Sequence, residues 1–266
     1  MKMKSPGFVR NRLRWLLIFG IIGLIAKIVF VFTHPQIDSG EVMDSSAYCS
    51  IAWNILAEKS FSEDGVIPSI RVAPLYPLFL AFLFKIFGFY PIVAKVIQCV
   101  IGVGISYLTY LLTKRYFHED VARFAFVVSL FVPDLFVISS FLYMETFFIF
   151  LFLAAILSIV ISIEKKQLYF FIIAGLIGGI ATLARGVTIY FPVLVFLFLL
   201  FRMKIVDSLK FCAVYSLFFC LVLAPWVIRN YITFDKFIPI ATGGGEVFWT
   251  GNYLPFDGKY NYEHTR

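Results

Sequence analysis

The chain has 266 residues, of which 61% are hydrophobic, 19% are aromatic and only 15% are charged. Soluble domains contain about 45–50% apolar and about 25% charged residues. The composition and the mean hydropathy of +0.91 therefore exclude an ordinary soluble domain and a disordered chain. The net charge of +7 does not indicate a nucleic-acid partner, because the basic residues lie in short clusters between apolar runs. We predict an all-α polytopic membrane protein.

Seven apolar runs are candidates for transmembrane helices, which need roughly 20 apolar residues each. In chain order they cover residues 15–32, about 91–112, 121–138, about 142–163, 168–184, 187–201 and 211–228. The run at 187–201 is the shortest of them. No cleavage site for a signal peptide follows the first run, so we expect it to stay in the membrane as a span.

The charges of the connecting segments predict the orientation of the chain. If the loops alternate between the two sides, thirteen basic and four acidic residues lie with the N-terminus, against eight basic and twelve acidic residues on the other side. The positive-inside rule then predicts a multi-pass protein of the plasma (inner) membrane with a cytoplasmic N-terminus. The long segment 33–90 and the C-terminal segment from 229 would be external, where we expect any chemistry.

The external segment 33–90 contains two expected helices that lie along the membrane surface. In the first, apolar side chains recur at helical spacing, and they are Tyr48, Ile51, Ala52, Ile55 and Leu56. In the second, Pro74 and Pro77 suit a first helical turn. Arg71 lies between the two helices. Asp44, just before the first helix, has the position of an N-cap, which would need no catalytic role.

The cysteine and histidine residues predict no metal site. Cys49, Cys99, Cys212 and Cys220 form no Cys-x-x-Cys motif, and the three histidines are scattered. Scattered acids leave a divalent cation open as a cofactor, but no cluster demands one.

Five motifs, in this order, resemble GT-C glycosyltransferases, and most closely the bacterial protein-mannosyltransferase-like and aminoarabinose-transferase-like branch (glycosyltransferase family 39-like). The motifs are Asp-x-x-x-Tyr (Asp44, Tyr48), RVAPLYPLFLAFLFKIFG at 71–88, FVPDLFVISSFLYMETFFIFL at 131–151, GLIGGIATLARGVTIYFP at 175–192 and LAPWVIRNYITFDKFIPIATGGGEVFWTGN at 223–252. The resemblance covers about residues 13–252. It implies that the protein takes a sugar from a polyprenyl-phosphate donor, which is held in the membrane among its lipids. The sugar would pass to a lipid, glycan or protein acceptor on the external face.

The resemblance implies that Asp44 is the general base for the attacking hydroxyl or amine. Glu145, three residues into the fourth span, matches a second acid that the family often has as Asp. It would bind the acceptor or support the base, although an acid at a helix N-terminus is also stabilising by itself. Asp134 beside Pro133 has a weaker claim and would also suit the cap of a broken helix. Asp38 and Glu41 are nearby competitors of Asp44 that we interpret as loop charges.

Three arginines at external span ends are candidates to bind the donor phosphate: Arg71, Arg185 and Arg229. The alternative for Arg71 is a cation that only reaches toward the membrane surface. Tyr48, Tyr76 and Asn230 are candidates to contact the substrate. Lys27 and Lys95 lie in spans and are expected to snorkel or to line the helix bundle. The stretch TGGGEVFWTGN is not a phosphate-binding loop, because no Gly-Lys-Ser/Thr follows, and we expect an external loop near the acceptor.

We assign residues 1–252 to one GT-C-like transmembrane domain and 253–266 to an external tail. Relatives continue with further spans, so we expect a truncated gene product or a fragment whose C-terminal part would begin in this tail. Two other classes stay open: a transporter or flippase of lipid-linked sugars, and a non-catalytic membrane scaffold. Ionisable residues gather at the external span ends rather than in mid-span, which favours surface chemistry over transport.

Overall fold

The structure is a computed structural model that describes residues 6–34 and 43–252; within these ranges the side chains of 6–13, 43–44, 246–247 and 250 are not described. Helices dominate this part of the chain, which contains no β-strand and one isolated bridge, between Ser62 and Pro68. The prediction of an all-α protein is therefore confirmed.

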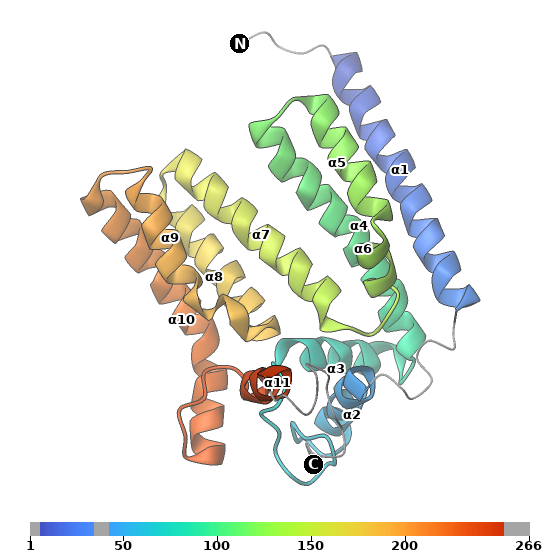
Figure 1. Cartoon of the computed structure of the whole chain (residues 1–266), viewed down its shortest axis with the longest axis vertical. Helices are drawn as coiled ribbons and strands as arrows, with labels where there is room; N and C mark the ends of the chain where they lie inside the picture. Colours follow the sequence, from blue (N-terminus) through green and yellow to red (C-terminus); the bar gives the residue numbers. More distant parts are fainter. Residues whose placement is uncertain (1–5, 35–42, 253–266) are drawn as a thin grey trace.

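The helices of the bundle run alternately between two ends (Figure 1). We call the end with residues 117–118, 166–167 and 201–204 the basic end, and the end with residues 43–90, 139–145, 184–190 and 235–252 the loop end. The bundle helices are α1 (Pro6–Thr33), α4 (Pro91–Tyr116), α5 (Glu119–Phe131), α6 (Pro133–Ile138), α7 (Met144–Lys165), α8 (Leu168–Ala184), α9 (Phe191–Leu200) and α10 (Ile205–Phe234). Their up-and-down course is the alternation that the hydropathy pattern predicts.

Among the described residues, four helices are long and apolar enough to cross a membrane: α1 from Arg14, α4, α7 and α10. The helix α8 and the stretch Gly186–Leu200 are apolar but shorter. Several apolar helices of this kind indicate a multi-pass membrane protein. The count of seven spans and the side of the membrane on which each end lies stay predictions.

The third predicted span is broken between α5 and α6. Pro133 has no backbone N–H and cannot continue a helix, so α5 ends at Phe131 and α6 begins at Pro133. The buried Lys27 of α1 reaches α6, where its Nζ donates to the carbonyl of Leu135 (3.2 Å) and to the hydroxyl of Ser139 (2.8 Å), the residue directly after this helix. Lys27 therefore lines the bundle, the second of the two roles expected from the sequence.

Small residues allow α8 and α10 to pack closely. A Cβ atom added at Gly179 would lie 2.9 Å from the Phe219 carbonyl oxygen, and one at Gly175 would collide with the carbonyl oxygen of Tyr215. Membrane helices associate largely through such close backbone contacts. The largest buried apolar cluster forms around this contact and includes Phe171, Ala174, Tyr215, Phe219, Ala73 and Ile240.

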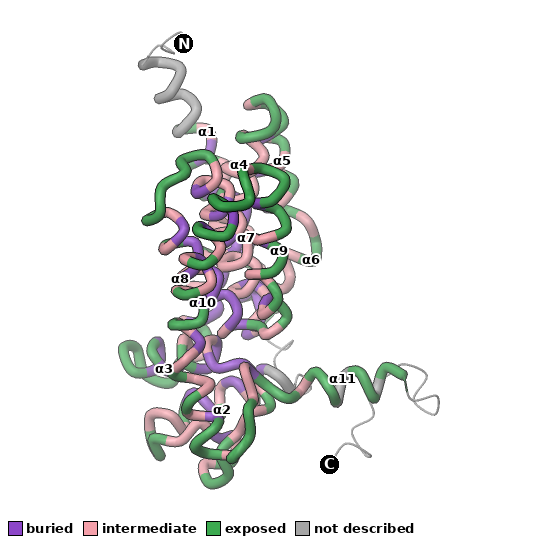
Figure 2. Tube along the Cα trace, turned by 90° about the vertical axis from the view of Figure 1, so that its left-hand side faces the viewer, coloured by how far each residue is buried: buried purple, intermediate pink, exposed green. Residues whose placement is uncertain are grey.

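Two further helices, α2 (Met43–Ala57) and α3 (Leu75–Phe87), lie beneath the bundle at the loop end (Figures 1 and 2). They are the two helices predicted in the segment 33–90. Tyr48, Ile51 and Ala52 are buried, so the predicted apolar face of α2 is its packing face. Their position along a membrane surface stays a prediction.

The Gly-rich stretch near the C-terminus is helical rather than a loop. It forms α11 (Gly243–Asn252), which extends to one side of the loop end (Figure 2). The expectation of a loop was wrong, since residues 243–252 form a helix. Only its first glycine is closely packed: a Cβ at Gly243 would lie 2.9 Å from the Arg71 carbonyl oxygen, whereas the other glycines of the helix have open space around them. The predicted tail 253–266, and Asp38 and Glu41, lie outside the described residues.

Candidate active site at the loop end

Two predicted site residues meet at the loop end. Glu145 is in the first turn of α7 and Arg185 directly follows α8, and the Arg185 Nη1 donates to the Glu145 Oε1 at 3.3 Å. The guanidinium also lies over the Phe148 ring, at 5.9 Å from its centroid. Both side chains keep access to solvent, with 44% of Arg185 and 32% of Glu145 exposed. The pair is therefore accessible from solvent.

The start of α2 lies beside the start of α7. The Ser45 hydroxyl donates to the carbonyl oxygen of Leu142 at 3.5 Å, which is three residues before Glu145. Asp44 precedes Ser45 and lies inside the first turn of α2 rather than before it. The side chain of Asp44 is outside the described residues; the contact of the next residue, Ser45, with Leu142 shows only that the start of α2 lies against the segment just before α7.

A buried series of hydrogen bonds links α3 and α4 to the start of α7. The Tyr76 hydroxyl of α3 donates to Gln98 Oε1 of α4 at 2.6 Å, and Gln98 Nε2 donates to the Tyr143 carbonyl at 2.9 Å. Tyr76 and Gln98 are fully buried, and the Tyr48 ring packs edge-on against the Tyr76 ring with centroids 5.0 Å apart. Tyr143 is the N-cap residue of α7, so this series of hydrogen bonds fixes the position of the helix start and therefore of Glu145.

Burial also sets the protonation of these groups. It raises the pKa of the Tyr76 phenol well above its ordinary value, and the charges of Cys49, Tyr48 and Glu145 add to the rise. Burial raises the pKa of the Cys49 thiol to about 11, so this thiol is protonated at neutral pH. Tyr76 therefore acts as a hydrogen-bond donor, and the prediction that it contacts substrate stays a prediction.

Arg71 is exposed in the segment between α2 and α3, where α11 holds its backbone. The Thr242 N–H donates to the Ile70 carbonyl at 2.9 Å, and a Cβ atom at Gly243 would lie 2.9 Å from the Arg71 carbonyl oxygen. Only glycine allows the start of α11 to approach this closely. The Gly-rich stretch thus supports the backbone of Arg71.

One buried side chain, Ile240, connects the segments of Arg71 and Arg185. Ile240 shares a buried cluster with Ala73, two residues after Arg71. It also borders Gly186, where an added Cβ would lie 3.3 Å from the Ile240 Cβ. Both arginines therefore shortly precede residues that are grouped around Ile240, and both lie at the loop end.

A family model matches this part of the chain. Residues 71–228 match the model described as dolichyl-phosphate-mannose-protein mannosyltransferase, over more than half of the 266 residues. The chain belongs to this family. Neither a curated protein nor a solved structure gives a significant match.

Membership in the mannosyltransferase family places the chain among the GT-C glycosyltransferases, which take a sugar from a lipid-linked donor and pass it to an acceptor. This confirms the resemblance at the level of the family. The matched residues include Arg71, Tyr76, Glu145 and Arg185, and they begin after Asp44 and Tyr48. The branch, and the truncation expected from the short length, stay predictions.

The third predicted arginine of this mannosyltransferase-family chain has a visible structural role. Arg229 Nη1 donates to the Ser69 carbonyl at 3.1 Å and to Asn230 Oδ1 at 3.0 Å, and its guanidinium lies over the Phe61 and Trp226 rings. Asn230 is fully buried and donates to the Ile238 carbonyl. Both residues fasten the loop segments to α10, and their predicted contacts with donor and substrate stay predictions.

The other candidates from the sequence, Asp134 and a metal ion, are not part of this site as the structure describes it. Asp134 is exposed in the first turn of α6, but the N-cap of this helix is Val132, so Asp134 does not occupy the cap position suggested by the sequence. In the described part of the chain no three His, Cys, Asp or Glu side chains group closely enough to hold a metal ion. Sequence reasoning missed Gln98, because a single glutamine in an apolar run carries no pattern that identifies its partners.

Proposed function

We propose that this GT-C family member transfers a sugar from a polyprenyl-phosphate-linked donor to a lipid, glycan or protein acceptor on the external face of the membrane. The observation that carries the proposal is the Glu145–Arg185 pair beside the start of α2, where Asp44 lies. This reaction needs an acid that accepts a proton and a cation that stabilises the phosphate. Asp44 and Arg185 are the candidates for these tasks, and Glu145 is a second acid at the loop end.

The reaction assigns a role to each group. The acceptor oxygen or nitrogen attacks the anomeric carbon of the sugar, and its proton passes to the Asp44 carboxylate. The bond between that carbon and the phosphate oxygen breaks, and polyprenyl phosphate leaves with the negative charge. Arg71 and Arg185 stabilise this charge, since guanidinium groups bind phosphate oxygens in pairs.

Glu145 and Arg229 support this site in the proposal. Glu145 orients Arg185 before the donor binds and binds the acceptor afterwards. Arg229 holds the Ser69 carbonyl, and thereby the segment that carries Arg71. The apolar sides of α7, α8 and α9 provide the lipid-facing surface along which the polyprenyl tail would lie.

The orientation follows the charge bias. The basic end faces the cytoplasm and the loop end faces outward, in the plasma (inner) membrane, because thirteen basic residues against four acids lie with the N-terminus. The long-chain donor would then meet its acceptor at the outer surface.

The experiment is sugar transfer in proteoliposomes, with radiolabelled sugars on polyprenyl phosphate as donors. We compare the wild type with Arg71→Gln, Arg185→Gln and the control Lys236→Gln, which removes an exposed cation of the same end. The proposal requires transfer by the wild type and the control, and strong loss in both arginine variants. Correctly inserted protein that transfers no sugar from any such donor would contradict the proposal and favour a scaffold. Movement of the donor across the bilayer without transfer would favour a flippase.

A further inference from the structure

A pocket lies at the basic end, opposite the site described above. It has a volume of about 650 Å³ and is lined by Lys166, Phe201, Arg202, Met203, Lys204, Asp207 and Phe211. This volume is in the roughly 300–1,000 Å³ range of small-molecule sites. The lining comes from the C-terminal end of α7, the turn between α9 and α10, and the first turns of α10.

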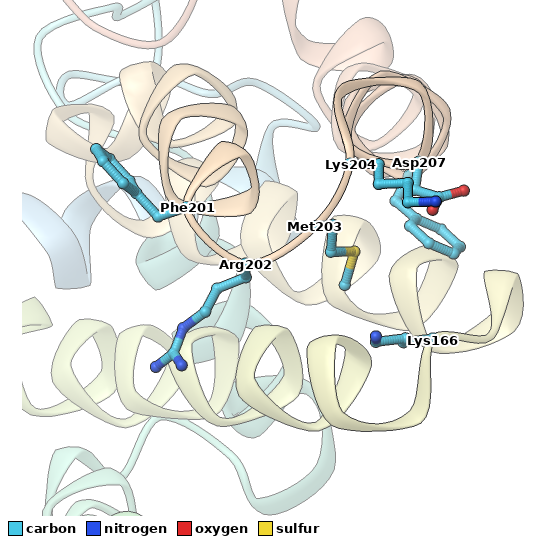
Figure 3. A pocket seen from close by; sticks show the side chains of 7 residues that line it. Lys166, Phe201, Arg202, Met203, Lys204 and Asp207 are labelled. Carbon is cyan, nitrogen blue, oxygen red and sulfur yellow. The ribbon is translucent and has the colours of Figure 1, made fainter.

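The lining joins positive charge to apolar surface. Figure 3 shows Lys204 and Asp207 on one side of the pocket and Arg202 on the other, with Met203 between them. The lining contains three cations and one carboxylate, so the pocket has an excess of positive charge. The apolar walls of the pocket are Phe201, Met203 and Phe211. A small inorganic anion that keeps its water would gain nothing from such walls.

The cations of this pocket differ from others at the same end. Lys114, Arg115 and Arg123 all form ion pairs, with Glu119 or Glu164. In the part of the chain that the structure describes, Lys166, Arg202 and Lys204 form no ion pair within 4.0 Å; the Arg202 guanidinium lies over the Phe198 ring instead. The pocket therefore has cations that are available to an external anion.

The surroundings of the pocket are apolar and exposed. Phe201 is 86% exposed, and the neighbouring Ile205 and Val206 of α10 are also well exposed. Large apolar side chains at the end of membrane-spanning helices face the lipid. An anion that reaches this pocket from the membrane would keep its acyl chains against this surface.

We propose that this pocket binds the phosphate group of an anionic membrane lipid. Basic pockets between membrane helices on the cytoplasmic side bind acidic headgroups in other proteins, and here the apolar walls and the exposed apolar rim favour a lipid over a free phosphate ion. The lipid would stabilise the contact of α7 with the turn between α9 and α10. The proposal does not depend on the proposed function, since the site lies at the other end of the bundle.

Lys166 offers a variant that separates binding from folding. It caps α7 in the left-handed conformation, with φ 53°. Glycine favours this conformation, so Lys166→Gly removes the cation without adding backbone strain. The matched control is Lys165→Gln with Lys210→Gln, which removes two exposed cations of the same end that do not line the pocket.

The test measures lipid binding by the full chain in detergent, by native mass spectrometry and by titration with a fluorescent short-chain phosphatidylglycerol. For Lys166→Gly with Lys204→Gln we expect affinity to fall about thirtyfold, from two lost cation contacts. The control double variant should lose less than about threefold, because its cations do not line the pocket and are exposed to solvent, where salt screens them. Phosphatidylcholine should bind weakly to all of them.

The other outcomes are decisive as well. Equal losses in the pocket variant and the control would overturn the proposal, because binding would then follow diffuse charge. Equal affinity for phosphatidylcholine would also overturn it. Inorganic phosphate forms a separate arm: displacement of the lipid by phosphate at about 10 mM would keep the phosphate site and assign it to a free anion, whereas no displacement supports the lipid.

Discussion

The Arg185 guanidinium donates to the Glu145 carboxylate at 3.3 Å, across the loop-end termini of α8 and α7. Forty residues separate the two along the chain, and the packing of α7 against α8 brings them together. Because both side chains keep access to solvent, their ion pair contributes little to stability, about 0.2–1 kcal/mol. Its position beside the start of α2 is better explained by a role at the site.

Removal of either charge of this pair should separate stability from activity. For Glu145→Gln and Arg185→Gln we expect unfolding midpoints in detergent near that of the wild type. Sugar transfer should fall about tenfold to a hundredfold, since each variant would lose a charge-assisted hydrogen bond to the donor or the acceptor, which contributes about 1.5–3 kcal/mol. Equal, large losses of stability in both variants would instead assign the pair to folding.

Gly243 and Gly244 form a matched pair at the start of α11. A Cβ at Gly243 would lie 2.9 Å from the Arg71 carbonyl oxygen, whereas nothing lies within 4 Å of one at Gly244. Gly243→Ala should therefore displace the backbone of Arg71 and raise the KM for the donor severalfold, and Gly244→Ala should not. A normal KM in Gly243→Ala would show that Arg71 does not need this support.

The hydrogen bond from Tyr76 to Gln98 should stabilise the loop end. Tyr76→Phe leaves the buried Gln98 oxygen without its donor, which costs about 1–3 kcal/mol. The control is Tyr107→Phe, at an exposed tyrosine. Thermal unfolding in detergent should show a lower midpoint only for Tyr76→Phe, and equal midpoints would contradict the role of this bond.

The pH dependence of Tyr76 has a defined sign. Burial raises its pKa above the ordinary value of 10.0, so folding favours the protonated phenol. Its contribution to stability is complete below about pH 10 and is lost as the pH rises through the higher pKa of the folded state. Unfolding midpoints between about pH 8 and 11 should fall more steeply for the wild type than for Tyr76→Phe; parallel curves would remove Tyr76 as the cause.

The close contact of α8 with α10 should depend on Gly175. An added methyl group there meets the Tyr215 carbonyl, and overpacking of this kind costs about 1–3 kcal/mol. Gly20→Ala is the control, because its Cβ would make an ordinary contact with Val103 at 3.6 Å. We expect a lower unfolding midpoint for Gly175→Ala alone, and the opposite order would contradict this packing.

Hydropathy and helical spacing were sufficient to predict the main helices and the buried face of α2. They predicted Glu145 and Arg185 as separate candidates, but their contact depends on how α7 packs against α8. The spacing also missed Gln98, whose role exists only because α3 and the start of α7 meet around it. The helix α11 forms despite the low helix propensity of its glycines. The structure explains the glycine at position 243, because its close approach to the Arg71 carbonyl oxygen requires a residue without a side chain.

The most direct test of the central claim is sugar transfer by Asp44→Asn, compared with Glu58→Gln, an exposed acid that directly follows the C-terminal end of α2. If Asp44 is the general base, Asp44→Asn should lower the rate constant of sugar transfer by about 10²–10⁴-fold. Membrane insertion should be normal and donor binding should change little. The Glu58→Gln control should keep the wild-type rate. Transfer by Asp44→Asn at the wild-type rate would contradict the account.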